Sequence, residues 1–325
     1  MKTYLITGGA GFIGSHLVDR LIQDGHEVVV IDNFSGGREE NIPPRSHLTL
    51  YRQSICDDMS AIFKKHSASR RIDAVFHLAA LPRVQFSVAK PWESHEANTD
   101  GTLKLLIAAR DAGVKRFVYS SSSSVYGDQA TLPLVETMIP LPISPYALQK
   151  LTGEHYCRLF AMLYGMETVS LRYFNVYGPR QNPSDAYAGQ IPKFFDKFLR
   201  GEAPVINGDG EQTRDNTYVD DVVEANILAA GVEPLNPSIS GSTATDWGDY
   251  FNIGGGHNYS VNQTSNYILQ FTKTNLQATH GPAVVEPRNT LADIAKAQQV
   301  LGWTPKTDYE SGLKKTYEYF ANALR

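Results

Sequence analysis

Short, unbroken apolar runs alternate with helical patterns through the first half of the chain. Such runs are typical of parallel strands whose two faces are both covered by helices. Between them, apolar residues recur at helical spacing, and a long helix is predicted from Pro145 to Leu163, ending at Gly165. The alternation predicts an α/β fold with a doubly wound parallel sheet. The predicted strands are residues 4–6, 28–31, 74–76, 117–119 and 168–174.

The pattern changes after about residue 175. A loop over 178–189 leads to a predicted helix at 192–200, and residues 205–219 predict a β-hairpin with its turn at 207–210. Residues 238–249 have loop composition, and two terminal helices are predicted at 293–301 and 309–324. We therefore expect two domains. Residues 1–175 form the sheet, with some later segments returning to it, and residues 176–325 form a smaller, loop-rich domain that covers a ligand site.

Composition narrows the class of protein. The 42% apolar and 20% charged residues are ordinary for a soluble globular protein, and the net charge of −4 offers no basic surface to nucleic acid. No apolar stretch approaches the ~18 residues of a membrane span, and the chain starts with a strand rather than a signal peptide. Cys56 and Cys157 form no disulfide or metal pattern. We expect a cytoplasmic protein with no metal, no nucleic-acid partner and no membrane partner.

A glycine-rich loop joins the first strand to the first helix. In "TGGAGFIG" (7–14), Gly8, Gly11 and Gly14 allow a tight turn, close approach to a pyrophosphate, and packing of the helix on the strand. The helix N-terminus adds unpaired N–H groups for phosphates. Asp32 ends the second strand, where a carboxylate accepts both ribose hydroxyls and repels a 2′-phosphate. The pattern predicts a Rossmann-type domain that binds NAD, while Arg38 nearby leaves NADP as the alternative.

Two further motifs carry hydroxyl groups. The run "YSSSSSVYGD" (119–128) reads either as a linker or as part of a site. It follows a strand, and the carboxyl edge of a parallel sheet is where ligands bind. In "SPYALQK" (144–150), Tyr146 and Lys150 are four residues apart, so a helix places them on one face. By itself that spacing is also common in surface pairs.

Glycine loop, serine run and Y-x-x-x-K, in this order, resemble the extended short-chain dehydrogenase/reductase family. The stretches "LRYFNVYGPRQ" (171–181), "INGDGEQTRD" (206–215) and "TLADIAKAQQVLGWTPK" (290–306) extend the resemblance over essentially the whole chain. It is strongest to the UDP-sugar 4-epimerases, particularly the branch that takes UDP-N-acetylhexosamines. The resemblance implies an isomerase that uses NAD, binds a UDP-sugar, and forms a homodimer through helices near 99–111 and 146–164.

The resemblance also implies roles for individual residues. The catalytic residues would be Ser122, Tyr146 and Lys150. The cofactor would contact Gly8, Gly11, Phe12, Ile13, Gly14, Asp32, Asn33, Ser35, Gly36, Ser54, Ile55, Leu78, Ala79, Ala80, Asn98, Ser120, Tyr146, Lys150 and Phe174. The substrate would contact Ser122, Tyr146, Asn175, Gln190, Val205, Asn207, Arg214, Arg288 and Thr290.

The chemistry of an alcohol oxidation explains the catalytic trio. A free tyrosine titrates at about 10, but a lysine ammonium and the positive nicotinamide ring both favour the phenolate. Lowering this pKa by ~3 requires ~4 kcal/mol, which two partly desolvated cations can supply. Tyr146 would then be the general base, Ser122 would hydrogen-bond the reacting oxygen, and Lys150 would also hold the nicotinamide ribose.

Local differences separate the reactions that this family catalyses. The 4,6-dehydratases carry Asp-Glu directly after the catalytic hydroxyl, and the nucleotide-sugar decarboxylases carry Glu at the second position. Here these positions are Ser123 and Ser124, and a hydroxyl cannot replace a carboxylate as acid or base near neutral pH. Epimerisation at C4 is therefore favoured. A UDP-glucuronate 4-epimerase or decarboxylase is the alternative, and a dinucleotide sensor without turnover is a remote one.

Some positions depart from the family pattern. Ser54 replaces a common aspartate at the adenine, Asn216 replaces an aromatic residue, and Ala283 replaces a second diphosphate arginine, for which Arg288 is the candidate substitute. Thr290 falls where a bulky tyrosine in the family excludes a C2 N-acetyl group. A small residue there predicts that N-acetylated sugars also fit. The alternative is that Thr290 only begins the following helix and faces solvent.

Overall fold

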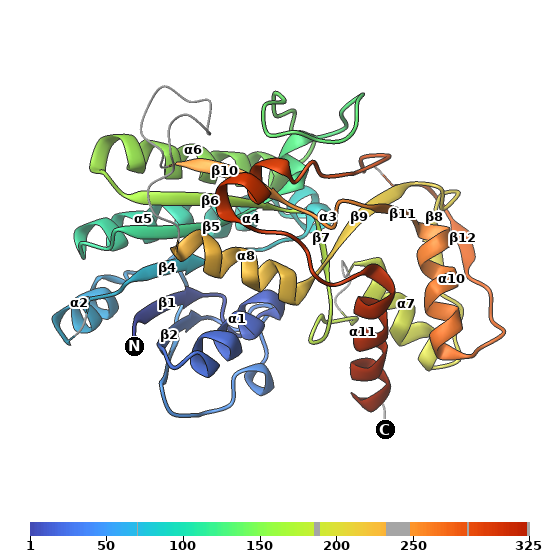
Figure 1. The fold of residues 1–325 in the computed structure, drawn as a ribbon, viewed down its shortest axis with the longest axis horizontal. Coiled ribbons are helices and arrows are strands. Elements are labelled where there is room, and N and C mark those ends of the chain that lie inside the picture. The colour runs from blue at the N-terminus through green and yellow to red at the C-terminus, as the bar shows by residue number, and fades with distance from the viewer. Residues whose placement is uncertain (70, 185–188, 232–247, 285, 324–325) are drawn as a thin grey trace.

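The computed structural model describes residues 1–69, 71–184, 189–231, 248–284 and 286–323. A seven-stranded sheet lies at its centre, in the order β10-β6-β5-β4-β1-β2-β3, and every neighbouring pair is parallel (Figure 1). This confirms the predicted α/β fold. The strands are β1 (Thr3–Thr7), β2 (Glu27–Asp32), β3 (Leu48–Arg52), β4 (Ala74–His77), β5 (Arg116–Ser122), β6 (Glu167–Tyr173) and β10 (Asp249–Ile253).

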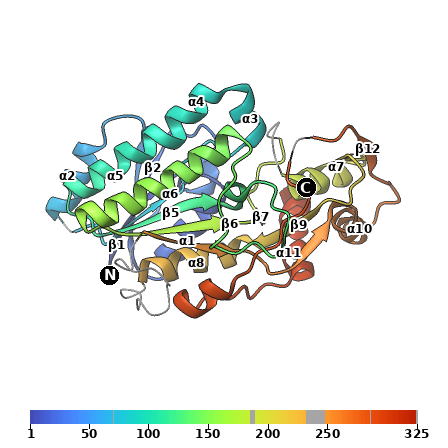
Figure 2. The same cartoon turned by 90° about the horizontal axis from the view of Figure 1, so that it is seen from above.

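Helices cover both faces of the sheet, as Figure 2 shows. One layer contains α2 (Ser60–Ser69), α5 (Gly101–Asp111) and α6 (Pro145–Tyr164), and the other contains α1 (Phe12–Gln23) and α8 (Val219–Gly231). The apolar run in β1 is continuous because its residues serve both layers: Tyr4 and Ile6 belong to one core cluster, and Leu5 belongs to the other. The short helices η1 (Glu39–Asn41), α3 (Val84–Ala89), α4 (Pro91–His95) and η2 (Glu96–Asp100) lie in the connections of this half.

Local sequence signals determine where α6 begins and ends. The Ser144 hydroxyl accepts a hydrogen bond from the Ala147 N–H, Pro145 occupies the first turn, and Gly165 closes the helix in the left-handed conformation at φ 65°. The predicted long helix is therefore confirmed. It places Tyr146 at the end of α6 that meets the carboxyl edge of the sheet.

Besides α8, which covers the large sheet, the described residues of the second half form two small sheets and a group of helices around them. β7 (Asn175–Tyr177), β9 (Thr213–Tyr218) and β11 (Asn258–Ser260) form one sheet, while β8 (Val205–Asn207) and β12 (Thr279–Gly281) form the other. α7 (Gln190–Leu199), α10 (Val261–Thr272) and α11 (Tyr309–Ala323) pack around a separate apolar core. β10 does not stay with them, because it pairs with β6 and extends the large sheet.

The hairpin prediction for residues 205–219 is wrong. β8 pairs in parallel with β12, whereas β9 pairs with β7 and β11. The glycines at 208 and 210 do turn the chain, both at positive φ, but the Gly208 N–H donates to the Gly281 carbonyl instead of closing a turn onto β9. A partner strand about 70 residues away therefore replaces the local one.

The predicted terminal helices are confirmed with shifted boundaries. The first begins at residue 295, continues as the π-helix η4 (Ala297–Leu301), and ends at Gly302. Most of the predicted 238–249 loop lies outside the described residues, and Asp249 already begins β10. None of the helices in the described ranges combines the length and apolar character needed to cross a membrane.

Candidate active site

A cavity of about 1980 Å³ opens at the carboxyl edge of the sheet. Residues that follow β1, β2, β4 and β5 line one side, and residues from the smaller half, including α7 and β8, line the other. All but one of the predicted cofactor residues line this cavity, the exception being Asn98. All but one of the predicted substrate residues do so too, the exception being Arg288. The fold thus brings together motifs from both halves of the chain.

The glycine loop fits a closely approaching phosphate group. A Cβ on Gly8 would lie 2.7 Å from the Ala79 backbone nitrogen, and one on Gly14 would lie 2.1 Å from the Gly8 carbonyl oxygen. Side chains are therefore excluded at both positions, and Gly8 also has φ at 72°. The start of α1 follows directly, so its free N–H groups face this part of the cavity.

Asp32 is buried at the end of β2. Its carboxylate accepts hydrogen bonds from the Ala10 N–H at 2.8 Å and the Phe34 N–H at 2.7 Å. Burial raises the pKa of Asp32, and these two N–H groups oppose that effect. Each oxygen keeps a lone pair for a ribose hydroxyl. Arg38 is the residue that could bind the 2′-phosphate of NADP, but it donates a hydrogen bond to Asn182 Oδ1 at 2.8 Å instead. The residues around Asp32 therefore fit NAD.

The serine run continues β5 and its members make different contacts, so the linker reading is wrong. The Ser120 carbonyl accepts from Lys150 Nζ at 2.7 Å, and the Ser121 hydroxyl donates to Glu154. Ser122 Oγ accepts from the Ser124 N–H at 3.2 Å and caps the short helix η3 (Ser123–Tyr126). Among the described residues, Ser124 Oγ is buried without a hydrogen-bond partner, in a side chain that lines the cavity.

Tyr146 and Lys150 lie one turn apart at the start of α6. Both are buried, and Lys150 Nζ lies 5.9 Å from the centroid of the Tyr146 ring. Burial raises the pKa of Tyr146, while a hydrogen bond with Ser122 and the charge of Arg83 lower it. Burial lowers the pKa of Lys150 to about 8, against the raising effects of Cys157 and Glu154. The buried phenol and amine thus meet the half-buried Ser122 hydroxyl in one group suited to moving a proton.

Two residues assigned to ligands by resemblance have other contacts. The Asn98 side chain accepts from the Leu81 N–H at 2.7 Å and donates to the Leu81 carbonyl at 3.1 Å, so it holds the loop that lines the cavity. Arg288 is 54% exposed and pairs with Asp209 through two hydrogen bonds of 3.0 and 2.9 Å. The structure does not bring Arg288 to the cavity as a substitute for the arginine that is missing at Ala283.

Arg214 and Thr290 lie at the opposite wall. Arg214 Nη2 pairs with the Glu286 carboxylate at 2.9 Å, and both residues line the cavity. Thr290 is only 8% exposed, and its hydroxyl accepts from the Asp215 N–H at 3.2 Å. The alternative that Thr290 starts a helix and faces solvent is wrong, because the helix begins five residues later and the side chain is buried.

Sequence reasoning missed three residues near the catalytic group. Arg83 lines the cavity and its charge reaches Tyr146, but no local pattern marks it. Ser87 Oγ accepts from the Tyr146 N–H at 3.0 Å and ties α3 to α6. Glu154 follows Lys150 by four residues, so extending the Tyr146–Lys150 spacing by one step would have found it.

Comparison with known proteins identifies the family. Residues 4–238 match the model of the NAD dependent epimerase/dehydratase family. The chain belongs to this family. This match, together with the relatives described next, confirms the chain's resemblance to the UDP-sugar 4-epimerases, its class as an isomerase and its use of NAD. Within the described ranges of this epimerase-family chain, no group of three or more His, Cys, Asp or Glu residues is placed to hold a metal ion.

Similar members of the epimerase/dehydratase family include the UDP-glucose 4-epimerase of Mycolicibacterium smegmatis, 37% identical over 324 residues and 99% of each chain. The crystal structure of the Thermotoga maritima UDP-glucose 4-epimerase with UDP-glucose has a TM-score of 0.90 and 41% identity, covering 99% of this chain and 100% of that one. The UDP-N-acetylglucosamine 4-epimerase of Methanobrevibacter ruminantium M1, in complex with UDP-N-acetylmuramic acid, has a TM-score of 0.89 and 38% identity, covering 99% of each chain.

Proposed function

We propose that this protein epimerises UDP-hexoses at C4, and that it takes both UDP-glucose/UDP-galactose and UDP-N-acetylglucosamine/UDP-N-acetylgalactosamine. The observation that carries the proposal is the meeting of Ser122 with the buried Tyr146 and Lys150 at the cavity, where Ser122 is followed by Ser123 and Ser124 rather than by carboxylates. These side chains can move one proton at the substrate. They offer no carboxylate for expelling water or carbon dioxide.

In the proposed mechanism, Tyr146 takes the proton of the C4 hydroxyl and later returns it to the same oxygen. The glycine loop and Asp32 would hold NAD, which would supply a reversible hydride acceptor for C4. Ser122 donates a hydrogen bond to the C4 oxygen, and the charged Lys150 stabilises the phenolate. The cycle is balanced, because the proton and the hydride are both restored and only the configuration at C4 changes. Inversion requires the sugar to present its other face between the two transfers.

Arg214 is proposed to hold the diphosphate of the nucleotide while the sugar turns. Its guanidinium is largely buried and donates from Nη1 to the Thr213 carbonyl at 2.8 Å, so its position is fixed by the backbone. A fixed guanidinium suits two-pronged binding of phosphate oxygens. The salt bridge to Glu286 supplies a negative partner when no phosphate is present. Arg288 has no part in this proposal, since Asp209 holds it outside the cavity.

The breadth of the sugar range rests on Thr290, which lines the cavity with a small side chain. The test is to incubate the purified protein with a panel of UDP-sugars and to resolve the products by NMR. Thr290→Tyr should lose the N-acetylated pair by roughly ten- to a hundredfold and keep the UDP-galactose reaction, because overpacking costs ~1–3 kcal/mol. Thr290→Ser is the matched control, since it keeps the hydroxyl that accepts from the Asp215 N–H. Equal loss on both sugar classes in Thr290→Tyr contradicts the assignment.

A second candidate substrate is UDP-glucuronate, for which Arg83 is the specific observation. This residue lines the cavity, and its charge acts on Tyr146, so a cation lies near the reacting sugar. A C6 carboxylate would be stabilised there, with the buried Ser124 hydroxyl as a further donor. The same panel of UDP-sugars distinguishes the two proposals. This second proposal replaces the first if the protein epimerises UDP-glucuronate but not the uncharged UDP-hexoses, and if Arg83→Met loses that activity.

We also propose that the protein is a homodimer that assembles through α5 and α6. Both helices expose large apolar side chains, which are costly to leave in water. The exposed residues on them are Ile107, Leu148, Leu159, Met162, Leu163 and Tyr164. Light scattering should give the mass of a dimer, and Leu163→Glu should shift it towards that of a monomer. A cytoplasmic location is proposed on the two free cysteines, Cys56 and Cys157.

A further inference from the structure

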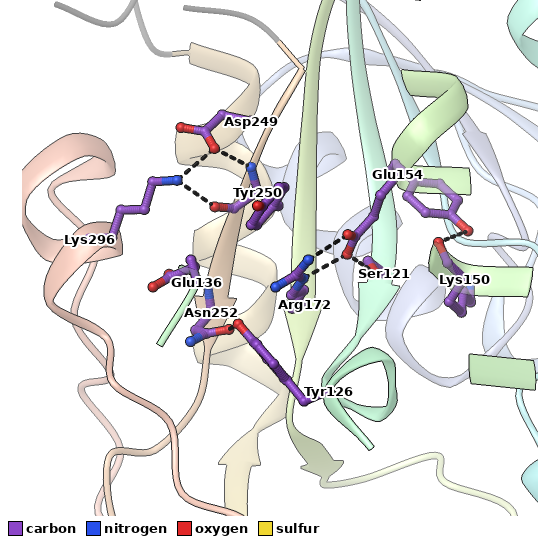
Figure 3. Close-up of polar contacts among 11 residues, drawn as sticks. Ser121, Tyr126, Glu136, Lys150, Glu154, Arg172, Asp249, Tyr250, Asn252 and Lys296 are labelled. Atoms are coloured by element: carbon purple, nitrogen blue, oxygen red, sulfur yellow. Dashed lines mark hydrogen bonds and ion pairs between the residues drawn. The ribbon is translucent and has the colours of Figure 1, made fainter. Parts of the chain in front are cut away.

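A buried ion pair lies behind the proposed catalytic residues. Arg172 of β6 donates to Glu154 of α6 through two parallel hydrogen bonds, Nε to Oε1 at 2.8 Å and Nη2 to Oε2 at 2.7 Å (Figure 3). The side chains are 1% and 3% exposed. The guanidinium also lies over the rings of Tyr126 and Tyr250, 4.7 and 3.9 Å from their centroids. Burying such a pair contributes little stability compared with apolar residues, so stability alone does not explain it.

The pair connects to the serine run through Ser121. The Ser121 hydroxyl donates to Glu154 Oε1, the same oxygen that accepts from Arg172 Nε. Four residues earlier on α6, Lys150 donates to the carbonyl of Ser120. The helix is therefore bound to two consecutive residues of β5, immediately before Ser122. Tyr146, Lys150 and Glu154 are spaced four residues apart and form one stripe of α6. Each of them bonds to the serine run, at Ser122, Ser120 and Ser121 respectively.

We propose that Ser121, Glu154 and Arg172 form a positioning brace that holds Tyr146 and Lys150 at a fixed separation from Ser122. None of the three brace residues needs to touch a ligand. Proton transfer between a phenol and a substrate oxygen depends steeply on distance, and a misplacement of ~1 Å costs about a hundredfold in rate. The brace supplies that control by joining the helix that carries the base to the strand that carries the hydroxyl.

Charge gives the brace a second effect, on Lys150. Burial lowers the pKa of Lys150 to about 8, and Glu154 is one of the groups that oppose this. Burial would also lower the pKa of Arg172, but its bonds to Glu154 raise it, so the guanidinium stays charged. Loss of the carboxylate should therefore lower the pKa of Lys150 further. The other titratable groups that face Lys150 or Tyr146 are His77 on β4, Tyr119 on β5, Cys157 on α6 and Arg83 before α3.

The kinetic test rests on the proposed function and uses NAD-loaded protein. Ser121→Ala should lower kcat roughly tenfold and leave KM unchanged, because it loosens the brace without altering any charge. Glu154→Gln should lower kcat at least as far and move the alkaline arm of the pH–rate profile to lower pH. Glu167→Gln is the matched control: it removes the carboxylate that pairs with Arg116 at 3.0 Å, at the opposite ends of the same two strands. It should keep both kcat and the pH profile.

A second variant covers the case in which Glu154→Gln does not fold. Glu154→Met with Arg172→Met replaces the buried pair by apolar side chains of similar length, which folded proteins commonly accept. This double variant should fold and still lose turnover. Wild-type kcat in either Ser121→Ala or the folded double variant would overturn the brace.

A readout without substrate separates the brace from the proposed function. The phenolate of Tyr146 can be titrated by ultraviolet absorbance, as the difference between each protein and its Tyr146→Phe counterpart. Ser121→Ala should raise the apparent pKa of Tyr146 by about one, which is a tenfold smaller phenolate fraction at a given pH. If wild-type protein turns over none of the UDP-sugars, the proposed function fails. An unchanged Tyr146 pKa in Ser121→Ala overturns the brace whether or not turnover is seen.

Discussion

Lys150 should destabilise the folded protein at neutral pH, so Lys150→Met should stabilise the protein while abolishing its activity. The ammonium is buried, with the Ser120 carbonyl as its hydrogen-bond acceptor at 2.7 Å. Burial lowers the pKa of Lys150 from 10.5 to about 8. One pKa unit corresponds to 1.36 kcal/mol, so a difference of about 2.5 destabilises the folded state by about 3 kcal/mol. This cost applies at every pH at which the lysine is charged in both the folded and the unfolded state. Losing the hydrogen bond to Ser120 lowers the stability of the variant by ~1 kcal/mol. The methionine variant should therefore be more stable than wild type by about 2 kcal/mol.

The sign of this effect follows from proton binding. The unfolded chain holds the Lys150 proton more tightly than the folded one, so the cost is complete below pH 8. The cost shrinks as the pH rises from about 8 towards 10.5. In this range the folded lysine is neutral, and proton binding favours the unfolded chain less and less as the pH approaches 10.5. The stability advantage of Lys150→Met should therefore be largest at pH 7 and should disappear by about pH 10.

Urea unfolding of the cofactor-free protein at pH 7 and pH 10 measures both quantities. Lys296→Met is the control, since Lys296 Nζ pairs with Asp249 at 2.6 Å and its removal should destabilise the protein at pH 7. A Lys150→Met protein that is less stable than wild type at pH 7, or whose advantage is the same at both pH values, would refute the reasoning.

The remaining predictions concern ligand and turnover. Asp32→Ala should weaken NAD binding by ~1.5–3 kcal/mol in calorimetry, because the ribose loses a charged acceptor, and unchanged affinity would contradict the assigned role. Tyr146→Phe should lose at least ~100-fold in kcat and Ser122→Ala less, since only the first removes the general base. A fully active Tyr146→Phe protein would exclude the proposed mechanism.

The large sheet could be predicted because its signal is local. Each buried parallel strand reads as an apolar run, and β1 shows why, with alternate residues in two cores. β3 was not predicted because its residues are only half-buried at the edge of the sheet. The pairing of β8 was predicted wrongly for a different reason. Its partner β12 is distant in sequence, and no pattern of apolar residues specifies which strand pairs with which.

The candidate site likewise has parts that the sequence predicts and parts that depend on contacts between distant elements. The glycine loop, the serine run and the Tyr146–Lys150 spacing are contiguous, so the sequence alone predicted them and their place at one edge of the sheet. Arg83 and the Arg172–Glu154 pair depend on contacts between separate elements and on burial. The sequence contains these residues but does not show which side chains they contact. Arg288 is the converse case. It was the candidate substitute for the diphosphate arginine that is missing at Ala283, but its side chain pairs with Asp209 instead.

The serine run shows how a repetitive sequence can have several distinct roles. Successive side chains of a strand point to opposite faces, so Ser120 and Ser121 are directed to different layers. The Ser120 hydroxyl contacts the Tyr173 hydroxyl, which itself donates to Asn226 of α8, whereas the Ser121 hydroxyl donates to Glu154 of α6. Inserting or deleting one serine would exchange these faces and move the hydroxyl of Ser122 away from Tyr146. Register, rather than composition, therefore determines which hydroxyl in the run is placed for catalysis.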